Sequence, residues 1–191
     1  GVQTCALPIS GNHAIRRIGV DGQVSTLAGG TRGFVDGPAD QARFDGPMGV
    51  AVDAQGNVYV ADTWNDRIRV ISADGRVRTL AGGDRPAHVD GFAGVARFDT
   101  PVALAWDGAG SLLVADFMNN AIRRVAMDGR VDTVVAAGSV INGPLSLARS
   151  HDGVLYVGDR GGRIVQVSAQ GHQIALTATG QVSRLARPSG L

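Results

Sequence analysis

Three aspartates recur at matching points of the sequence and could act together. Asp62, Asp116 and Asp159 each end a short apolar run, in VYVAD, LLVAD and LYVGD. Carboxylate oxygens are ligands that Ca²⁺ prefers, so one hypothesis gathers the three side chains around a cation. The alternative is that each aspartate accepts hydrogen bonds from its own turn and from the Arg-Ile segment that follows. A catalytic residue has no reason to recur identically in every repeat, so we favour the structural interpretation and expect no metal or other cofactor.

Further polar residues repeat together with these aspartates. Asn65 and Asn119 follow an aspartate at the same spacing, and Arg67 and Arg163 stand directly before an isoleucine. By the same reasoning we interpret all four as structural residues of the repeat. The histidines share no motif, and no G-x-S-x-G elbow, P-loop or Cys-His pair is visible. We therefore assign no catalytic residue and lean away from an enzyme.

Function is better sought where the repeats differ from one another. Trp64, Phe117, Met118 and Arg160 lie in the turns that follow the three aspartates, and three of these residues are large and apolar. Apolar side chains at a turn that faces water commonly anchor an interface. The alternative is that they pack beneath neighbouring loops, together with the phenylalanines of those loops. Both interpretations stay open, and these four residues are our candidates for binding a ligand or partner.

The repeats also predict the elements that position these residues. The segment NVYVADTWNDRIRVI (57–71) returns as SLLVADFMNNAIRRV (111–125) and VLYVGDRGGRIVQV (154–167). In the first copy, apolar runs separated by AQGN, TWND and ADGR predict four short strands, at 49–53, 58–62, 67–72 and 77–81. Four antiparallel strands that recur every roughly 40–55 residues are typical of a β-propeller blade. The predicted fold class is therefore all-β, a β-propeller of four-stranded antiparallel blades.

The same residues carry a family resemblance. GNVYVADTWNDRIRVI, with PMGVAVD before it, resembles the NHL repeat, whose pattern is P-x-G-V-A-V-D, G-N-x-Y-V-A-D and then N-x-R-I. The resemblance covers about residues 11–191, and it is weaker in the last full copy, where Ser150 replaces the first Asp and Gly158 replaces Ala. It implies a six-bladed ring similar to bacterial NHL-repeat proteins, which by analogy are periplasmic or extracellular. Lactonases, lyases and non-enzymatic interaction domains have similar propellers, so the motif implies a fold and not a chemistry.

The repeat predicts unit boundaries as well. We expect a half blade at 11–30, three complete blades at 47–83, 101–138 and 144–178, and the start of the next blade at 183–191. Residues 1–10 break the repeat, and we interpret them as a non-native or disordered leader. The chain would then be a fragment of a six-bladed ring, and the missing blades of its parent chain are expected partners.

Strand direction predicts where the loops of the blades gather. Successive antiparallel strands alternate in direction, so the connection into the first strand lies at the same end as the turn between the second and third. The long inserts at 29–46 and 82–100 therefore share one end of the blades with the turns at 63–66 and 117–120. Long loops on a rigid scaffold usually carry binding. This end of the blades is our candidate for the functional face.

Composition excludes some function classes. The 18 basic residues are all arginine and the 17 acidic residues are all aspartate, which leaves a net charge of +1 and no basic footprint for nucleic acid. No apolar run reaches the roughly 20 residues of a membrane span. We therefore expect a non-catalytic scaffold that binds a protein, glycan or small ligand on its long-loop face. The alternative is a metal-dependent hydrolase or lyase, similar to lactonases, that holds Ca²⁺ and has part of its key residues in the missing half.

Overall fold

The chain folds into four antiparallel sheets. The computed structural model describes residues 5–138, 140–168 and 172–176, and within these ranges it contains strands, turns and two short 3-10 turns. Consecutive strands are neighbours in each sheet, except that β4 pairs with β8 at one edge, and each sheet forms one blade. Among the described residues, none belongs to a helix long and apolar enough to cross a membrane.

The strands follow the repeat of the sequence. The first blade contains β1 (Cys5–Ile9), β2 (Ala14–Ile18) and β3 (Val24–Gly29). The second contains β5 (Gly49–Val52), β6 (Val58–Asp62), β7 (Arg67–Ile71) and β8 (Arg76–Gly82), and the short β4 (Gly37–Pro38) pairs with β8. The third contains β9 (Pro101–Trp106), β10 (Leu112–Asp116), β11 (Ala121–Val125) and β12 (Val131–Val135). The fourth contains β13 (Pro144–Arg149), β14 (Leu155–Asp159), β15 (Ile164–Val167) and β16 (Gln173–Leu176).

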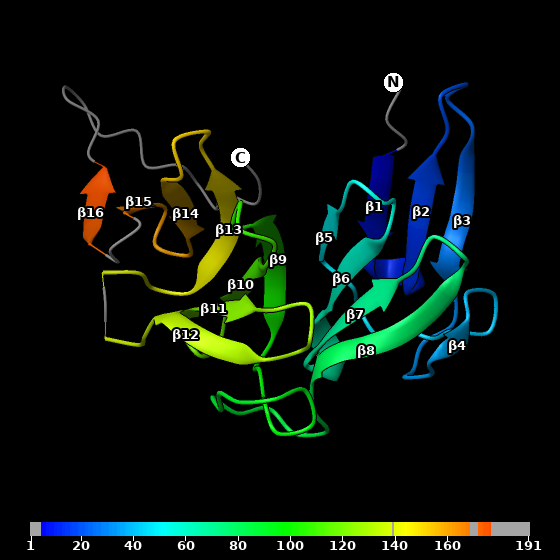
Figure 1. The fold of residues 1–191 in the computed structure, drawn as a ribbon, viewed down its shortest axis with the longest axis horizontal. Coiled ribbons are helices and arrows are strands. Elements are labelled where there is room, and N and C mark those ends of the chain that lie inside the picture. The colour runs from blue at the N-terminus through cyan, green and yellow to red at the C-terminus, as the bar shows by residue number, and fades with distance from the viewer. Residues whose placement is uncertain (1–4, 139, 169–171, 177–191) are drawn as a thin grey trace.

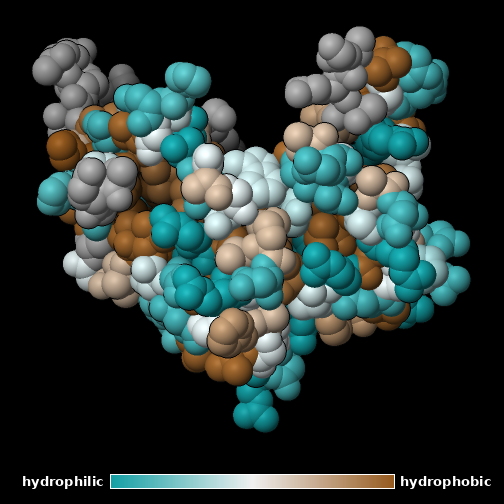
Figure 2. All heavy atoms as spheres, viewed as in Figure 1, coloured by the Kyte–Doolittle hydropathy of each residue, from teal (hydrophilic) through white to brown (hydrophobic). Residues whose placement is uncertain are grey.

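The four blades are arranged around a shared centre, as in a β-propeller. In Figure 1 the strands β1, β5, β9 and β13 lie on the inner side, and β3, β8, β12 and β16 lie on the outer side. Figure 2 shows the centre as a notch in the outline of the molecule. The predicted all-β fold class with four-stranded antiparallel blades is confirmed. A six-bladed ring stays a prediction, because the described residues form four blades.

Of the two alternatives for residues 1–10, disorder is wrong for Cys5–Ile9, and a non-native origin stays a prediction. Cys5–Ile9 forms β1, which pairs along its whole length with β2. Side chains of β1 alternate between exposed and partly buried, as expected of a strand with one face on its neighbours. Pro8 is tolerated because β1 is the edge strand of its sheet. Residues 1–4 and the predicted start of a further blade at 183–191 lie outside the described residues.

The long inserts lie at the predicted end of the blades. The side-chain amide of Asn65 donates a hydrogen bond to the carbonyl of Gly33 at 2.9 Å, and that of Asn119 donates to the carbonyl of Ala87 at 2.9 Å. Each insert is therefore fastened to the turn between the second and third strands of the blade that follows it. We call this end of the blades the loop face, and its predicted composition is confirmed.

Each insert also fills the space between two blades. Phe44 is fully buried in a cluster that takes Ile15 from the first blade and Val60 and Ile71 from the second. Phe98 is fully buried in the equivalent cluster between the second and third blades. The inserts are thus part of the hydrophobic core, and the blades depend on them for contact with one another.

A β-bulge recurs in the first three blades, directly before an arginine of the third strand. The register between the third and fourth strands shifts directly after Ile15, Ile68 and Ile122, so one residue of the fourth strand is left without a partner. An arginine follows each of these isoleucines. The fourth blade pairs without this shift and has Val165 in place of the arginine. Bulges commonly redirect a side chain, and here the bulge accompanies the arginine.

Candidate functional site on the loop face

Arg69 is the centre of a buried polar network in the second blade. Its side chain is inaccessible to solvent, and its Nη1 donates to Asp62 Oδ2 at 2.7 Å. Its Nε and Nη2 donate to Asp36 Oδ1 at 2.9 and 2.6 Å. Asp62 also accepts hydrogen bonds from the Asn65 side chain and from the backbone N–H of Asp45. The guanidinium therefore ties β7 to the end of β6 and to the insert that precedes the blade.

The third blade contains the same network at equivalent positions. Arg123 is fully buried and donates from Nη1 to Asp116 Oδ2 at 2.8 Å. Its Nε and Nη2 donate to Asp90 Oδ1 at 3.2 and 2.6 Å. Asp116 accepts further hydrogen bonds from the Asn119 side chain and from the backbone N–H of Asp99. In both blades one buried cation is shared by two carboxylates, and each bond is charge-assisted.

The first and fourth blades depart from this network. In the first blade, Ile9 stands where the aspartate would be, and Arg16 donates to the Thr26 hydroxyl at 2.7 Å near the surface. In the fourth blade the aspartate is bound by Arg163, which stands before the isoleucine and not after it. Its Nε and Nη2 donate to Asp159 Oδ2 at 3.0 and 2.7 Å. The complete network is therefore a property of the second and third blades, which carry the long inserts.

Sequence reasoning found the aspartates and missed their main partners. Arg67 does not bind a carboxylate; its Nη1 donates to the carbonyl of Asn65 at 2.8 Å, and its guanidinium lies 4.0 Å from the centre of the Phe34 ring. The partners are Arg69 and Arg123, together with Asp36 and Asp90 of the inserts. The sequence contained a signal for these two aspartates, because FVDG (34–37) in the first insert returns as HVDG (88–91) in the second. Asp62 and Asp116 accept hydrogen bonds from the asparagines of their own turns, but their arginine partners follow the isoleucine and do not precede it.

Burial sets the protonation of these carboxyl groups. Burial raises the pKa of Asp116 from 3.8 to about 6, against hydrogen bonds from Asn119 and Asp99 and the charge of Arg123, which act to lower it. Burial likewise raises the pKa of Asp62. A carboxyl whose pKa is higher in the folded than in the unfolded state binds a proton more tightly when folded.

Asp116 is therefore expected to make stability depend on pH. Its contribution to the free energy of unfolding should be fully present below the unfolded-state pKa of 3.8 and be lost as the pH rises through about 6. A carbon-detected NMR titration of the Asp116 carboxyl should show its midpoint near 6. The Asp116→Asn variant should lack this titration step. A midpoint at or below the ordinary aspartate value would contradict the prediction.

Each of the three blade boundaries is closed by the same contact on the loop face. In each of the first three blades, the residue directly after the turn asparagine has a left-handed φ. Its side chain accepts a hydrogen bond from a backbone N–H of the segment that connects to the next blade. The pairs are His13 with Gly46 at 3.1 Å, Asp66 with Thr100 at 2.8 Å, and Asn120 with Gly143 at 2.7 Å. The three acceptors differ in residue type, so no sequence motif revealed them.

The donors of these contacts also have positive φ, and this leads to a prediction for Thr100. Gly46 and Gly143 have φ of 55° and 62°, but Thr100 has a φ of 58°, which is unfavourable for a β-branched residue. We expect Thr100→Gly to raise the free energy of unfolding by about 1 kcal/mol, because the strain is relieved and the backbone N–H is kept. Urea denaturation measures the change. The reverse substitution, Gly46→Thr, should destabilise, and a loss of stability in Thr100→Gly would contradict the prediction.

Three of the four candidate binding residues are exposed, and two of these, Trp64 and Met118, share one repeat position. Trp64 and Met118 are 58% and 56% exposed, and both lie in the turn after the second strand of a blade. The backbone N–H of each donates to a carbonyl of the preceding insert, that of Asp45 or Asp99. The turn backbone is thus held rigidly while the side chain faces solvent.

The other two candidates lie together at the boundary of the third and fourth blades. The guanidinium of Arg160 is 5.8 Å from the centre of the Phe117 ring, which gives a weak cation–π contact. Phe117 also packs closely on Gly143 in the connector between these blades. Arg160 is itself exposed and Phe117 is half-buried, so the four predicted residues form three exposed side chains and one partly packed ring on the same face.

A pocket of about 420 Å³ lies elsewhere in the molecule, whereas the loop face has a smaller one, of ≈ 350 Å³, beside Trp64. The loop-face pocket is lined by His13, Arg32 and Asp45 in addition to Trp64. Arg32 Nε donates to Asp45 Oδ2 at 3.0 Å, and the Arg32 side chain is mostly exposed. An aromatic ring thus lies beside an accessible cation, in a hollow between the first and second blades.

Comparison with known proteins supports the repeat. Residues 44–71 match the family described as NHL repeat. NHL repeat-containing protein 2 of Homo sapiens is 32% identical over 140 residues, which is 65% of this chain and 19% of that protein. Protein SUPPRESSOR OF QUENCHING 1, chloroplastic, of Arabidopsis thaliana is 31% identical over 101 residues, which is 52% of this chain and 10% of that protein. The chain thus spans a fifth or less of these curated relatives.

Solved structures show the same fold at lower identity. A chain from the crystal structure of a Nidogen/Laminin complex has a TM-score of 0.72 and 17% identity, with 98% of this chain and 65% of that chain covered. A streptogramin B lyase structure has a TM-score of 0.66 and 18% identity, with 92% and 51% covered. Both likenesses concern the fold alone. The matched repeat, the similar NHL repeat-containing proteins and the four blades together show that the chain contains an NHL repeat within a β-propeller fold.

Proposed function

We propose that this chain is a non-catalytic propeller scaffold that binds a protein, glycan or small ligand on its loop face. The observation that carries the proposal is a contrast between two kinds of side chain on that face. The carboxylates of Asp62 and Asp116 are buried and bonded within the scaffold, whereas Trp64 and Met118 are held open to solvent. Large apolar side chains on a rigid exposed turn are typical anchors of an interface.

The pocket beside Trp64 adds polar recognition to this apolar contact. Arg32 is held by Asp45, so its guanidinium is oriented while it stays accessible to solvent. Arginine and tryptophan together are typical of binding hot spots.

A metal-dependent hydrolase or lyase fits the described residues less well. Asp62 Oδ2 accepts from Arg69 and Asn65, and its Oδ1 accepts from the backbone of Asp45. A Ca²⁺ ion bound to this carboxylate would lie against the buried guanidinium and would repel it. The similarity to the fold of a streptogramin B lyase does not favour catalysis over binding, because a chain of the Nidogen/Laminin complex structure has the same fold. The residues in hand therefore support binding over metal catalysis.

A photo-cross-linking experiment on the full-length protein tests the proposal for a protein partner. A photoreactive phenylalanine analogue replaces Trp64 in one variant and Gln55, which lies on the opposite end of the second blade, in a matched control. We expect one partner to be cross-linked from position 64, and its yield to fall in a Met118→Asp background. Equal cross-linking from both positions would contradict the proposal.

For a glycan or small ligand, tryptophan fluorescence gives the corresponding test. The chain has two tryptophans, so Trp106→Phe leaves Trp64 as the reporter of the loop face. We expect a saturable change in Trp64 emission with a glycan or small-molecule library member, and the change should weaken in Arg32→Ala. If neither experiment detects binding at position 64, the proposal is wrong.

A further inference from the structure

A second pocket lies at the opposite end of the blades, between the second and third. We call this end the hairpin face, because it carries the turns at 53–57 and 107–111 that join the first and second strands. The pocket has a volume of ≈ 420 Å³, within the range of about 300–1,000 Å³ typical of small-molecule sites. Its lining includes Asp53, Tyr59, Trp106 and Met127. None of these residues belongs to the loop face.

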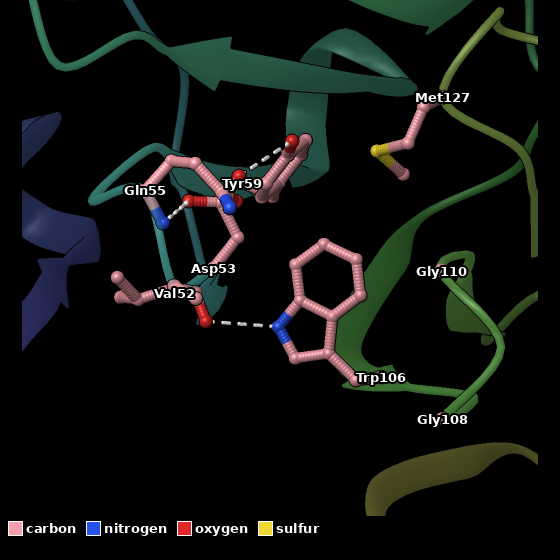
Figure 3. Close-up of a pocket in the computed structure, with 9 residues that line it drawn as sticks. Val52, Asp53, Gln55, Tyr59, Trp106, Gly108, Gly110 and Met127 are labelled. Atoms are coloured by element: carbon pink, nitrogen blue, oxygen red, sulfur yellow. Dashed lines mark hydrogen bonds between the residues drawn. The ribbon is translucent and has the colours of Figure 1, made fainter.

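Two aromatic rings form a fixed wall of this pocket. The rings of Tyr59 and Trp106 meet edge to face, with 5.1 Å between centroids and an interplanar angle of 88°. The indole N–H of Trp106 donates to the carbonyl of Val52 at 2.9 Å, across the blade boundary. Figure 3 shows the indole in the middle of the group, with Tyr59 and Asp53 on one side and Met127 on the other. Because its N–H is already bonded, the indole contributes its ring and no free donor to the pocket lining.

Asp53 brings a negative charge to the same pocket. Its Oδ2 accepts hydrogen bonds from the Tyr59 hydroxyl at 3.1 Å and from the Asn57 side chain at 2.7 Å. Partial burial acts to raise the pKa of Asp53, but these bonds and those from backbone N–H groups hold it below its usual value. The group is therefore a carboxylate at neutral pH.

No cation neutralises Asp53 among the described residues. In the ranges that the structure covers, no arginine or histidine lies within ion-pair distance of its carboxylate. The equivalent Asp107 of the third blade, in contrast, lies 3.3 Å from Arg124 Nε. Arg78 affects the pKa of Tyr59 but is not part of the pocket lining. Asp53 therefore places a carboxylate without an ion-pair partner beside the aromatic wall, and the nearby Arg149 guanidinium packs on Gly108 of the lining.

The hairpin alone does not explain this combination of residues. The fourth blade has Ser150 in place of the aspartate, and its Oγ accepts the backbone N–H of Val154, so the turn forms without a carboxylate. The fourth-blade counterpart of Trp106 is Arg149, which packs on Gly108 of the third blade. The acid and the aromatic pair thus come together at one of the described blade boundaries. Function is expected where repeats differ.

We propose that this pocket binds a small organic cation, an alkylammonium or quaternary ammonium group. The cation would lie beside the Asp53 carboxylate, with its alkyl groups against Trp106 and Met127. Aromatic faces attract cations through their quadrupole, and tryptophan does so most strongly. The polarizable thioether of methionine suits the same alkyl surface. This proposal is independent of the loop face, because it rests on residues at the other end of the blades.

Choline and its neutral isostere, 3,3-dimethylbutan-1-ol, test the class of ligand. In the full-length protein with Trp64→Phe, Trp106 is the tryptophan of this chain that reports on the pocket. Choline should change its emission saturably, and the neutral isostere should bind about tenfold more weakly. Equal affinity for the two probes, preference for a sugar such as glucose, or no saturable change with choline would each overturn the proposal.

Matched charge variants separate the role of Asp53 from a general loss of folding. Asp53→Asn keeps an oxygen for the backbone N–H groups of the turn and removes the charge, so choline should bind about tenfold more weakly to a variant that remains folded by circular dichroism. Asp107→Asn makes the same change in the neighbouring blade and should leave choline binding intact. Unchanged binding in Asp53→Asn, or an equal loss in Asp107→Asn, would show that the carboxylate has no part in recognition.

Discussion

Arg69→Met is expected to lower the free energy of unfolding by about 3–5 kcal/mol. Arg69 is fully buried and binds the carboxylates of Asp62 and Asp36 together with the backbone carbonyls of Val35 and Arg43. Methionine fills most of the space but leaves the buried Asp62 without its cation. The cost is the stranded charge and the unsatisfied carbonyls, more than the attraction that is lost. Urea denaturation followed by circular dichroism measures the change.

Two further variants show whether the stranded charge is the cause. Arg16→Met makes the same substitution at the same repeat position, where the arginine bonds a threonine hydroxyl near the surface, so the loss should stay within about 0.5 kcal/mol. Adding Asp62→Asn to Arg69→Met should restore part of the stability, because the uncompensated carboxylate is gone. If Arg16→Met costs as much as Arg69→Met, the buried network is not the source of the effect.

Phe44→Ala is the second large effect that we expect, at about 3–5 kcal/mol. The Phe44 ring is fully buried between the first and second blades, where it contacts Ile15, Val60 and other buried side chains. Removing the ring leaves a cavity at the boundary and weakens the coupling of the two blades. In a repeat architecture each unit depends on contacts with its neighbours. We therefore expect the unfolding transition to broaden or split as well as to shift.

Phe92→Ala is the matched control for this prediction. Phe92 lies in the other insert and is 67% exposed, so its removal should change the free energy of unfolding by no more than about 0.5 kcal/mol. Phe98→Ala, at the position equivalent to Phe44, should reproduce the large effect. A small loss in both buried variants would mean that the inserts do not hold the blades together.

The repeat made the blades predictable because it recurs at the level of local pattern. Short apolar runs, Asp-Gly and Gly-Asn turns, and their regular spacing depend on neighbouring residues, and these predicted the second and third blades closely. The gathering of the inserts on one face followed from strand direction alone. β1 escaped prediction because its CALPI sequence has lost the motif of its counterparts, although its alternation still pairs it with β2.

The partners of the aspartates depended on contacts that no local pattern shows. Arg67 and Arg69 are two residues apart, and the β-bulge after Ile68 accompanies the one that reaches Asp62. Asp36 lies 33 residues away from Arg69 and meets it because the insert folds back over the blade. His13 joins the blade contacts through its backbone conformation, which its residue type did not reveal.

Amino-acid order alone was sufficient to establish the all-β fold class, the blade repeat, the loop face and the residues that vary on it, because each follows from spacing and strand direction. The tertiary structure was needed to show which of those residues are free. It shows that Trp64, Met118 and Arg160 are exposed, whereas the Phe117 ring is half-buried. It also brings Trp106 of the third blade against Tyr59 of the second, because packing between blades joins residues that are distant in the chain.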